Sequence, residues 1–250
     1  MDFHCHLDLY PNARDVYAQA QERNEFTWLV TTSPRAFTAT SRVLGGSDKV
    51  LITPGLHPEI VGARHAELDM LLEQIRQVKA VGEVGLDGSK RFQASYDVQR
   101  SVFIAVVAQC AALGGRVLSI HSRQAVKDVL AVLHDHPGYG TAVLHWFTGT
   151  TTELNAAIAQ DCWFSIGPAA FNSAAGQALA KKLPRDQVVP ESDGPFAQVD
   201  GASVMPWSAG QTAQFLGKAW DVTPADAMHV LESNSRRLLG LIRGQGRPEP

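Results

Sequence analysis

Two histidines separated by one residue, His4 and His6, stand near the start of the chain in the stretch MDFHCHLDLY, with Asp8 close behind. Side chains alternate between the two faces of a β-strand, so both imidazoles would share one face while Cys5 would point to the other. Two imidazoles on one face form a chelating pair for a divalent metal ion. An isolated pair of this kind also arises by chance, so its meaning depends on what the rest of the chain places opposite it.

Further histidines and carboxylates lie at or near the ends of other apolar runs: His57, Glu83, His121, His145 and Asp193. A single histidine at the end of a strand is commonly a structural residue. Glu83 is different, because it lies inside the apolar stretch AVGEVGLD, where a carboxylate is costly to bury unless it is paired or binds a metal. Scattered structural histidines would have no reason to share this position, so the pattern predicts a metal centre.

The candidate ligands are too many for one tetrahedral site and suit two: His4, His6, Glu83, His121, His145 and Asp193. Glu83 has two carboxylate oxygens and is the natural bridge between ions about 3.5–4 Å apart, as in two-metal hydrolases. Such a pair lowers the pKa of a bound water and stabilises both the attacking and the leaving oxygen. We therefore expect a dinuclear centre in which Glu83 and Asp193 are catalytic.

Eight apolar runs, separated by amphipathic segments with helical spacing, would position these residues. The runs lie at 1–6, 27–32, 50–57, 80–87, 116–121, 141–146, 162–167 and 187–192. Strands that alternate with helices indicate a parallel sheet, and eight such units favour a closed (β/α)8 TIM barrel over a doubly wound open sheet. The carboxyl ends of barrel strands meet on the face that carries the active site. Pro190 cannot donate a ladder hydrogen bond, so we expect a bulge or an early end in the eighth run.

The composition is that of an ordinary globular protein, and no linker divides the 250 residues, so we expect one domain over 1–250. A net charge of −3 disfavours a protein that coats duplex nucleic acid. No run is long enough to span a membrane and no signal peptide is apparent. Three widely spaced cysteines indicate a reducing compartment, which we expect to be the cytoplasm. No dinucleotide-binding or P-loop glycine motif occurs.

The motifs around these residues occur in a defined order along nearly the whole chain. They are FHCHLD at 3–8, GLHP at 55–58, VGEVGLD at 81–87, IHSR at 120–123, LHWFTG at 144–149, SIGP at 165–168, ESDGPF at 191–196 and SNSRRLLG at 233–240. The ordered set resembles the TatD family of metal-dependent deoxyribonucleases, within the amidohydrolase-like barrels. Asn234 and Arg237 look like the closing Asn-x-x-Arg segment of that family.

This resemblance implies a ligand arrangement and a substrate. His4, His6 and Asp193 would hold one ion, His121 and His145 the other, and Glu83 would be shared. Members of the family hydrolyse phosphodiester bonds in DNA, typically as 3′-to-5′ exonucleases, so single-stranded DNA or DNA ends are the implied partner. The family suggests Mg²⁺, whereas four histidines among the ligands favour Mn²⁺, Zn²⁺ or Ni²⁺.

Within the family, the stretches MDFHCHLDLYP, LHWFTG and ESDGPFA are most similar to the QatD-type nucleases of the Qat antiphage defence system, which would imply other Qat proteins as partners. Three positions depart from the common family pattern. Trp146 replaces a frequent cysteine, Glu59 a frequent histidine, and Pro190 an aliphatic residue or threonine. None of these removes a ligand, but Glu59 puts the outer substrate contacts in question and Pro190 the path of the strand that presents Asp193.

Several residues near the predicted centre have two open interpretations. Asp193 would act as a general base or as a ligand only. His57 would contact the scissile phosphate or an additional ion, or would orient neighbouring ligands. Arg123 would bind phosphate or be solvated, and Glu191 would orient a ligand from behind Asp193.

Two other functions stay open on the sequence alone. The same metal pair would also hydrolyse an ester or amide of a small molecule, although a carboxylated lysine would favour that chemistry and this chain has Glu83 at the bridging position. Alternatively, the barrel would mainly bind partners in a defence complex, with conditional nuclease activity. The intact ligand set favours an active enzyme.

Overall fold

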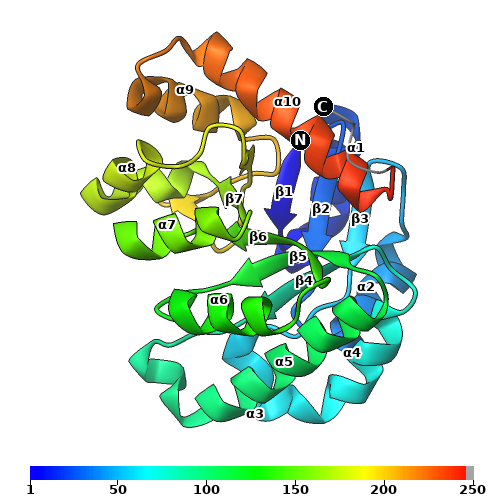
Figure 1. Cartoon of the computed structure of the whole chain (residues 1–250). Coiled ribbons are helices and arrows are strands. Elements are labelled where there is room, and N and C mark those ends of the chain that lie inside the picture. The colour runs from blue at the N-terminus through cyan, green and yellow to red at the C-terminus, as the bar shows by residue number, and fades with distance from the viewer. Residues whose placement is uncertain (246–250) are drawn as a thin grey trace. The chain divides into compact units, whose positions relative to one another are not determined.

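The computed structural model describes residues 1–245, which form two compact units (Figure 1). Unit 1 contains Met1–Leu29, Leu44–Leu51 and the chain from Phe164 onward, and unit 2 contains Val30–Val43 and Ile52–Trp163. Both units contain parallel strands that alternate with helices along the chain, as the sequence predicts.

The first sheet has the strand order β1 (Asp2–Cys5), β2 (Thr27–Val30), β3 (Val50–Thr53). β1 and β2 are parallel, with Asp2 opposite Thr27 and Cys5 opposite Leu29. Every residue of β1 and β2 is buried. Such complete burial is typical of parallel strands covered on both faces.

Unit 1 also contains the last two strands of the second parallel sheet. β7 (Trp163–Ile166) pairs in parallel with β8 (Val188–Pro190), with Phe164 opposite Val188. Two backbone hydrogen bonds then join β1 to the segment that follows β8. The Asp193 N–H donates to the His4 carbonyl and the His6 N–H donates to the Gly194 carbonyl, both at 2.9 Å. The first strand of the chain is therefore fixed beside the segment that carries Asp193.

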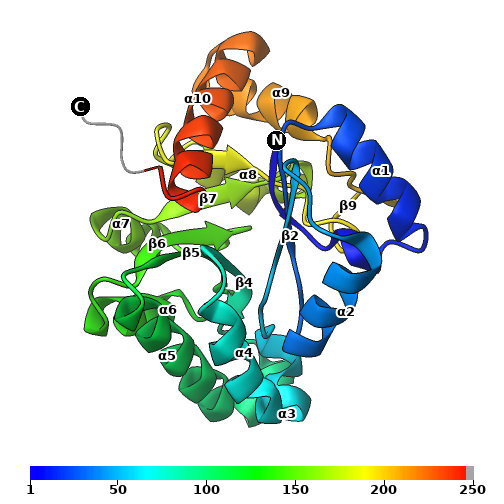
Figure 2. The ribbon, with the colours of Figure 1, turned by 90° about the vertical axis from the view of Figure 1, so that its right-hand side faces the viewer.

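Unit 2 contains three parallel strands in sequence order: β4 (Ala80–Gly85), β5 (Arg116–His121) and β6 (Gly140–His145). β4 is connected to the ends of the preceding strands, because the Thr31 N–H donates to the Gly82 carbonyl at 3.1 Å and the Gly82 N–H donates to the Pro54 carbonyl at 3.0 Å. Helices α4, α5 and α6 lie on one side of these three strands (Figure 2).

The helices are α1 (Ala13–Arg23), α2 (Pro34–Leu44), α3 (Val61–Arg64), α4 (Leu68–Ile75), α5 (Tyr96–Ala112), α6 (Val126–Asp135), α7 (Thr151–Ala159), α8 (Ala174–Ala180), α9 (Ala209–Trp220) and α10 (Pro224–Ile242). Short 3-10 helices lie at η1 (Leu7–Leu9), η2 (Pro58–Ile60), η3 (His65–Glu67), η4 (Lys90–Ser95) and η5 (Pro168–Asn172). Capping boxes begin α7 and α10, formed by Thr150 with Glu153 and by Thr223 with Asp226. Within residues 1–245, no helix is both long and apolar enough to cross a bilayer.

All eight predicted runs contain a strand, but most strands are shorter than the runs that predicted them. β8 ends at Pro190, so the expected early end is correct. The hairpin β9 (Gln198–Val199) and β10 (Ala202–Ser203) was not predicted, because two-residue strands leave no periodic pattern. The assignment of 1–250 to one domain stays a prediction, and residues 246–250 lie outside the described part of the chain.

Candidate metal centre

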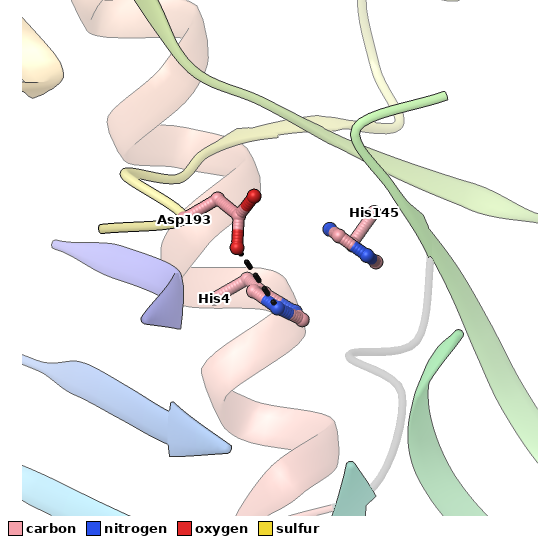
Figure 3. Close-up of side chains that lie close together, drawn as sticks. All are labelled: His4, His145 and Asp193. Carbon is pink, nitrogen blue, oxygen red and sulfur yellow. Dashed lines mark ion pairs between the residues drawn. The ribbon is translucent and has the colours of Figure 1, made fainter. Parts of the chain in front are cut away.

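Three predicted ligands, His4, His6 and Asp193, meet within unit 1. The Nε2 atoms of His4 and His6 lie 3.6 and 3.8 Å from Oδ1 of Asp193. The two imidazoles contact one another edge to face, with ring centroids 5.2 Å apart. All three residues are buried. Figure 3 shows His4, from β1, and Asp193, from the segment after β8, with the ion pair between them.

The spacing in this group fits ligands of one ion better than hydrogen bonds. Nitrogen and oxygen ligands about 2.0–2.2 Å from a tetrahedral ion lie about 3.3–3.6 Å from one another. The separations of 3.6 and 3.8 Å are close to that range and longer than an N–H···O hydrogen bond. Two imidazoles and one carboxylate are also a donor set that divalent transition metals accept.

Asp2 supports this group from behind and was not identified from the sequence as a site residue. Its Oδ1 accepts hydrogen bonds from the His4 N–H at 3.1 Å and the Ser192 N–H at 3.0 Å. Its Oδ2 accepts a hydrogen bond from the Ser192 hydroxyl at 2.6 Å. Burial raises the pKa of Asp2 to about 7, although the hydrogen bonds from Ser192 and His4 act in the opposite direction. The buried Asp2 carboxyl group thus connects the backbone of His4 to Ser192, the residue that precedes Asp193.

The backbone around Asp193 is also specified locally. Asp193 has a φ of 47°, in the left-handed region that aspartate enters more readily than most side chains. Gly194 follows directly, and a Cβ there would overlap the Tyr10 hydroxyl and the Val204 carbonyl. In the ESDGPF motif, the proposed ligand Asp193 is therefore followed by a position, Gly194, at which only glycine fits without a clash.

A second group, which we call the Glu83 group, lies in unit 2 and comprises His57, Glu83, His121 and His145. Oε1 of Glu83 lies 3.2 Å from Nε2 of His57, 2.9 Å from Nδ1 of His121 and 2.8 Å from Nε2 of His145. Glu83 is fully buried in β4, while His57 follows β3, His121 ends β5 and His145 ends β6. Ligand atoms of His57, Glu83 and His121 all lie within 4.8 Å of one another, as a metal site requires.

Asp87, just after β4, fixes the orientation of His121. Its Oδ2 lies 2.9 Å from Nε2 of His121, while the Ser89 N–H donates to its Oδ1 and its own N–H donates to Oε1 of Gln99, both at 2.8 Å. Carboxylates commonly orient metal-binding histidines through the second ring nitrogen in this way. Asp87 occupies Nε2, so Nδ1 is the nitrogen that His121 directs toward Glu83.

The hydrogen bonds between Asp87 and His121 shift the pKa values of both side chains toward their charged forms. Burial disfavours the charged form of both groups, but the hydrogen bonds outweigh it. The contacts with His121 and Ser89 lower the pKa of Asp87 to about 2. The contacts with Asp87 and Glu83 raise the pKa of His121 to about 9. In the absence of a metal, the pair is therefore an imidazolium and a carboxylate at neutral pH.

The remaining predicted site residues lie as follows. His57 contacts Glu83, and its Nδ1 accepts a hydrogen bond from the Glu59 N–H at 3.1 Å, which leaves the proton on Nε2. Arg123 is exposed. Glu191 is buried and accepts a hydrogen bond from the Ser165 hydroxyl at 2.5 Å. The phosphate-binding role of Arg123 and the orienting role of Glu191 stay predictions.

Sequence reasoning missed Asp2 and Asp87, although each left a weak signal. Asp2 precedes His4 by two residues and shares its strand, and Asp87 closes the quoted stretch VGEVGLD. Both are acids beside apolar runs, where burial demands a partner.

Buried imidazoles and carboxylates at the carboxyl ends of parallel strands define a metal-dependent hydrolase with an α/β fold. The family model for TatD related DNase matches residues 1–240. The chain belongs to this family of metal-dependent hydrolases, and the predicted enzyme class, a metal-dependent nuclease, is confirmed.

Two curated relatives match along almost their whole length, and a third matches along about three quarters of its length. The chain is 28% identical to deoxyribonuclease TATDN3 of Homo sapiens, over 97% of this chain and 95% of that protein. It is 30% identical to the uncharacterized metal-dependent hydrolase TatD of Mycobacterium tuberculosis, over 96% of this chain and 98% of that protein. It is 29% identical to the 3′-5′ ssDNA/RNA exonuclease TatD of Pantoea ananatis, over 76% of this chain and 78% of that protein.

Solved structures show the same fold. The crystal structure of YJJV, a TatD homologue from Escherichia coli K12, superposes with a TM-score of 0.82 at 20% identity, over 94% of this chain and 95% of that one. A TatD family hydrolase from Entamoeba histolytica gives a TM-score of 0.77 at 19% identity, over 95% of this chain and 96% of that one. The predicted (β/α)8 barrel class is thereby confirmed.

Proposed function

We propose that this protein hydrolyses phosphodiester bonds in single-stranded DNA or at DNA ends, with the polarity of a 3′-to-5′ exonuclease, by means of two divalent metal ions. The observation that carries the proposal is the arrangement of the Glu83 group, in which three imidazole nitrogens lie within 3.2 Å of one carboxylate oxygen. The Pantoea relative, named a 3′-5′ ssDNA/RNA exonuclease, supports the substrate and the polarity.

In this proposal each ion has its own ligands. His4, His6 and Asp193 would hold one ion and His121 and His145 the other, and Glu83 would be shared between them. Two bound ions would supply Lewis acidity that activates a water and neutralises charge on the phosphoryl oxygens. Mg²⁺ and Mn²⁺ suit the reaction, and the four imidazoles also accept Zn²⁺ or Ni²⁺.

The residues of the chain itself have defined tasks. Asp87 keeps His121 oriented with Nδ1 toward Glu83. Asp193 either accepts the proton of the attacking water or serves as a ligand only. Nε2 of His57 faces Oε1 of Glu83 at 3.2 Å in this structure. With substrate bound, His57 would contact the scissile phosphate in place of Glu83, and Arg123 would contact the adjacent phosphate from its exposed position.

The test is cleavage of a 5′-labelled single-stranded oligonucleotide by the purified protein with Mn²⁺ or Mg²⁺. A ladder that shortens from the 3′ end is expected from the wild type. Glu83→Gln should abolish cleavage, whereas Glu22→Gln, an exposed position in α1, should leave it unchanged. Cleavage of a small-molecule ester or amide without any cleavage of DNA would favour the amidohydrolase function instead.

The finer assignment to antiphage defence is a second part of the proposal. It is supported by the stretches MDFHCHLDLYP, LHWFTG and ESDGPFA, and it implies a cytoplasmic nuclease that works with other Qat proteins. Phage plaque counts on cells that carry the whole gene cluster test it. Protection should require an intact Glu83. Protection that survives Glu83→Gln would assign the protein a partner-binding role.

A further inference from the structure

Phe196 has the largest exposed fraction among the large apolar side chains of the described chain. The residue is 59% exposed, compared with 43% for Leu9 and 52% for Val43. It follows Asp193 by three residues, and its ring forms a T-shaped contact with the His6 ring, with centroids 5.1 Å apart and planes at 75°. A largely exposed aromatic residue therefore lies directly beside His6, one of the proposed metal ligands.

The backbone on both sides of Phe196 is fixed, so the ring does not lie on a loose loop tip. The Ala197 N–H donates to the Asp193 carbonyl, and the Ala197 carbonyl accepts from the Val204 N–H, both at 2.9 Å. The Ser203 hydroxyl donates to the Pro195 carbonyl at 3.1 Å. Ala197 itself is buried, with 2% exposed.

The position of Phe196 contributes little to folding. Burial of a large apolar side chain is the usual source of its stabilising effect, and more than half of this residue is exposed. The backbone hydrogen bonds of its neighbours nevertheless fix its main chain, and its ring contacts His6. A rigid, exposed aromatic face next to a phosphate-binding centre is the feature with which proteins stack the bases of single-stranded nucleic acid.

We propose that Phe196 is a substrate-binding residue that stacks on the nucleobase of the nucleotide held at His4, His6 and Asp193. The inference deepens the proposed nuclease function and rests on it. Every base has a π-face, so this contact selects single strands with little preference for sequence. It also requires an unpaired base, which would direct the enzyme to single-stranded ends.

The test measures binding separately from cleavage. A labelled oligothymidylate and a matched strand with abasic residues at its 3′ end are titrated with protein by fluorescence anisotropy, with Ca²⁺ in place of Mn²⁺. Phe196→Ala should weaken binding of the base-bearing strand by roughly 5- to 150-fold, as loss of one base–aromatic stack implies, and should leave the abasic strand unchanged. Phe196→Trp should restore binding, and Val43→Ala, at an exposed position of α2, should have no effect.

Cleavage assays with Mn²⁺ on the same variants separate this inference from the proposed function. Wild-type cleavage combined with equal binding of the base-bearing strand by Phe196→Ala would overturn the stacking role and leave the nuclease standing. A base-dependent loss of binding without any wild-type cleavage would support stacking and refute the hydrolase. If the wild type neither binds nor cleaves either strand, both are refuted.

Discussion

Asp2, in the first strand, and Ser192, next to Asp193, are joined by two hydrogen bonds. The Ser192 hydroxyl donates to Oδ2 of Asp2 at 2.6 Å, and the Ser192 N–H donates to Oδ1 at 3.0 Å. The same carboxyl group also accepts from the His4 N–H. Residues separated by 190 positions are thus held together immediately beneath two proposed ligands.

Asp2→Ala should therefore weaken metal binding as well as folding. Loss of a residue that supports metal ligands typically lowers metal affinity by roughly 10- to 100-fold, and we expect a loss of this size for Mn²⁺, measured by calorimetry. The donors left unpaired should lower the free energy of unfolding by about 1–3 kcal/mol. Asp2→Asn keeps the Oδ1 acceptor and should retain most of both quantities. Equal Mn²⁺ affinity of wild type, Asp2→Ala and the exposed-site control Asp48→Ala would contradict the supporting role.

Asp87 should control the protonation of His121. In metal-free protein the pKa of His121 is about 9, because Asp87 and Glu83 stabilise the imidazolium against the effect of burial. An ion must displace a proton from this ring, so the apparent Mn²⁺ affinity should rise with pH up to about 9. Asp87→Asn should lower that pKa, as measured by NMR titration of the metal-free variant. An unchanged His121 titration, identical to that of Asp135→Asn, would refute the coupling.

The three cysteines should be inert and should not bind the metal. Burial raises the pKa of both Cys110 and Cys162 to about 12, and Cys5 is fully buried as well. A thiol reagent at pH 8 should label native protein only slowly, because the thiolate is the reactive form, and should reach all three thiols after denaturation. The Co²⁺-loaded protein should lack thiolate-to-cobalt absorption. Rapid labelling of native protein, or such a band, would show that this description of the thiols is wrong.

Asn234, in the closing motif SNSRRLLG, has a structural role. Its side-chain N–H groups donate to the carbonyls of Arg185 and Val188, both at 2.8 Å, and Arg237 donates to the Asp186 carbonyl at 2.9 Å. These bonds attach α10 to the start of β8. Asn234→Ala should lower the unfolding free energy by about 1–3 kcal/mol, since it leaves buried carbonyls unpaired. Chemical denaturation measures this, and Mn²⁺ affinity of the folded variant should stay unchanged.

The sequence predicts a site residue when its role is visible from its neighbours in the chain, and misses it when the role depends on a distant partner. Glu83 and the strand-end histidines could be identified because polar residues are conspicuous in apolar runs. Asp2 could not, because its importance comes from Ser192, which is distant in the chain. The exposure of Phe196 likewise depends on the anchoring of Pro195 and Ala197 by the hairpin β9–β10, whose strands are too short to predict.

In the proposed function, Glu83 would be shared by two ions with separate histidine ligands. Anomalous diffraction from a crystal grown with Mn²⁺ tests it most directly. We expect two peaks about 3.5–4 Å apart. One should be bound by His4, His6 and Asp193 and the other by His121 and His145, with an oxygen of Glu83 at each. A single peak, or ions that do not contact Glu83, would contradict the account.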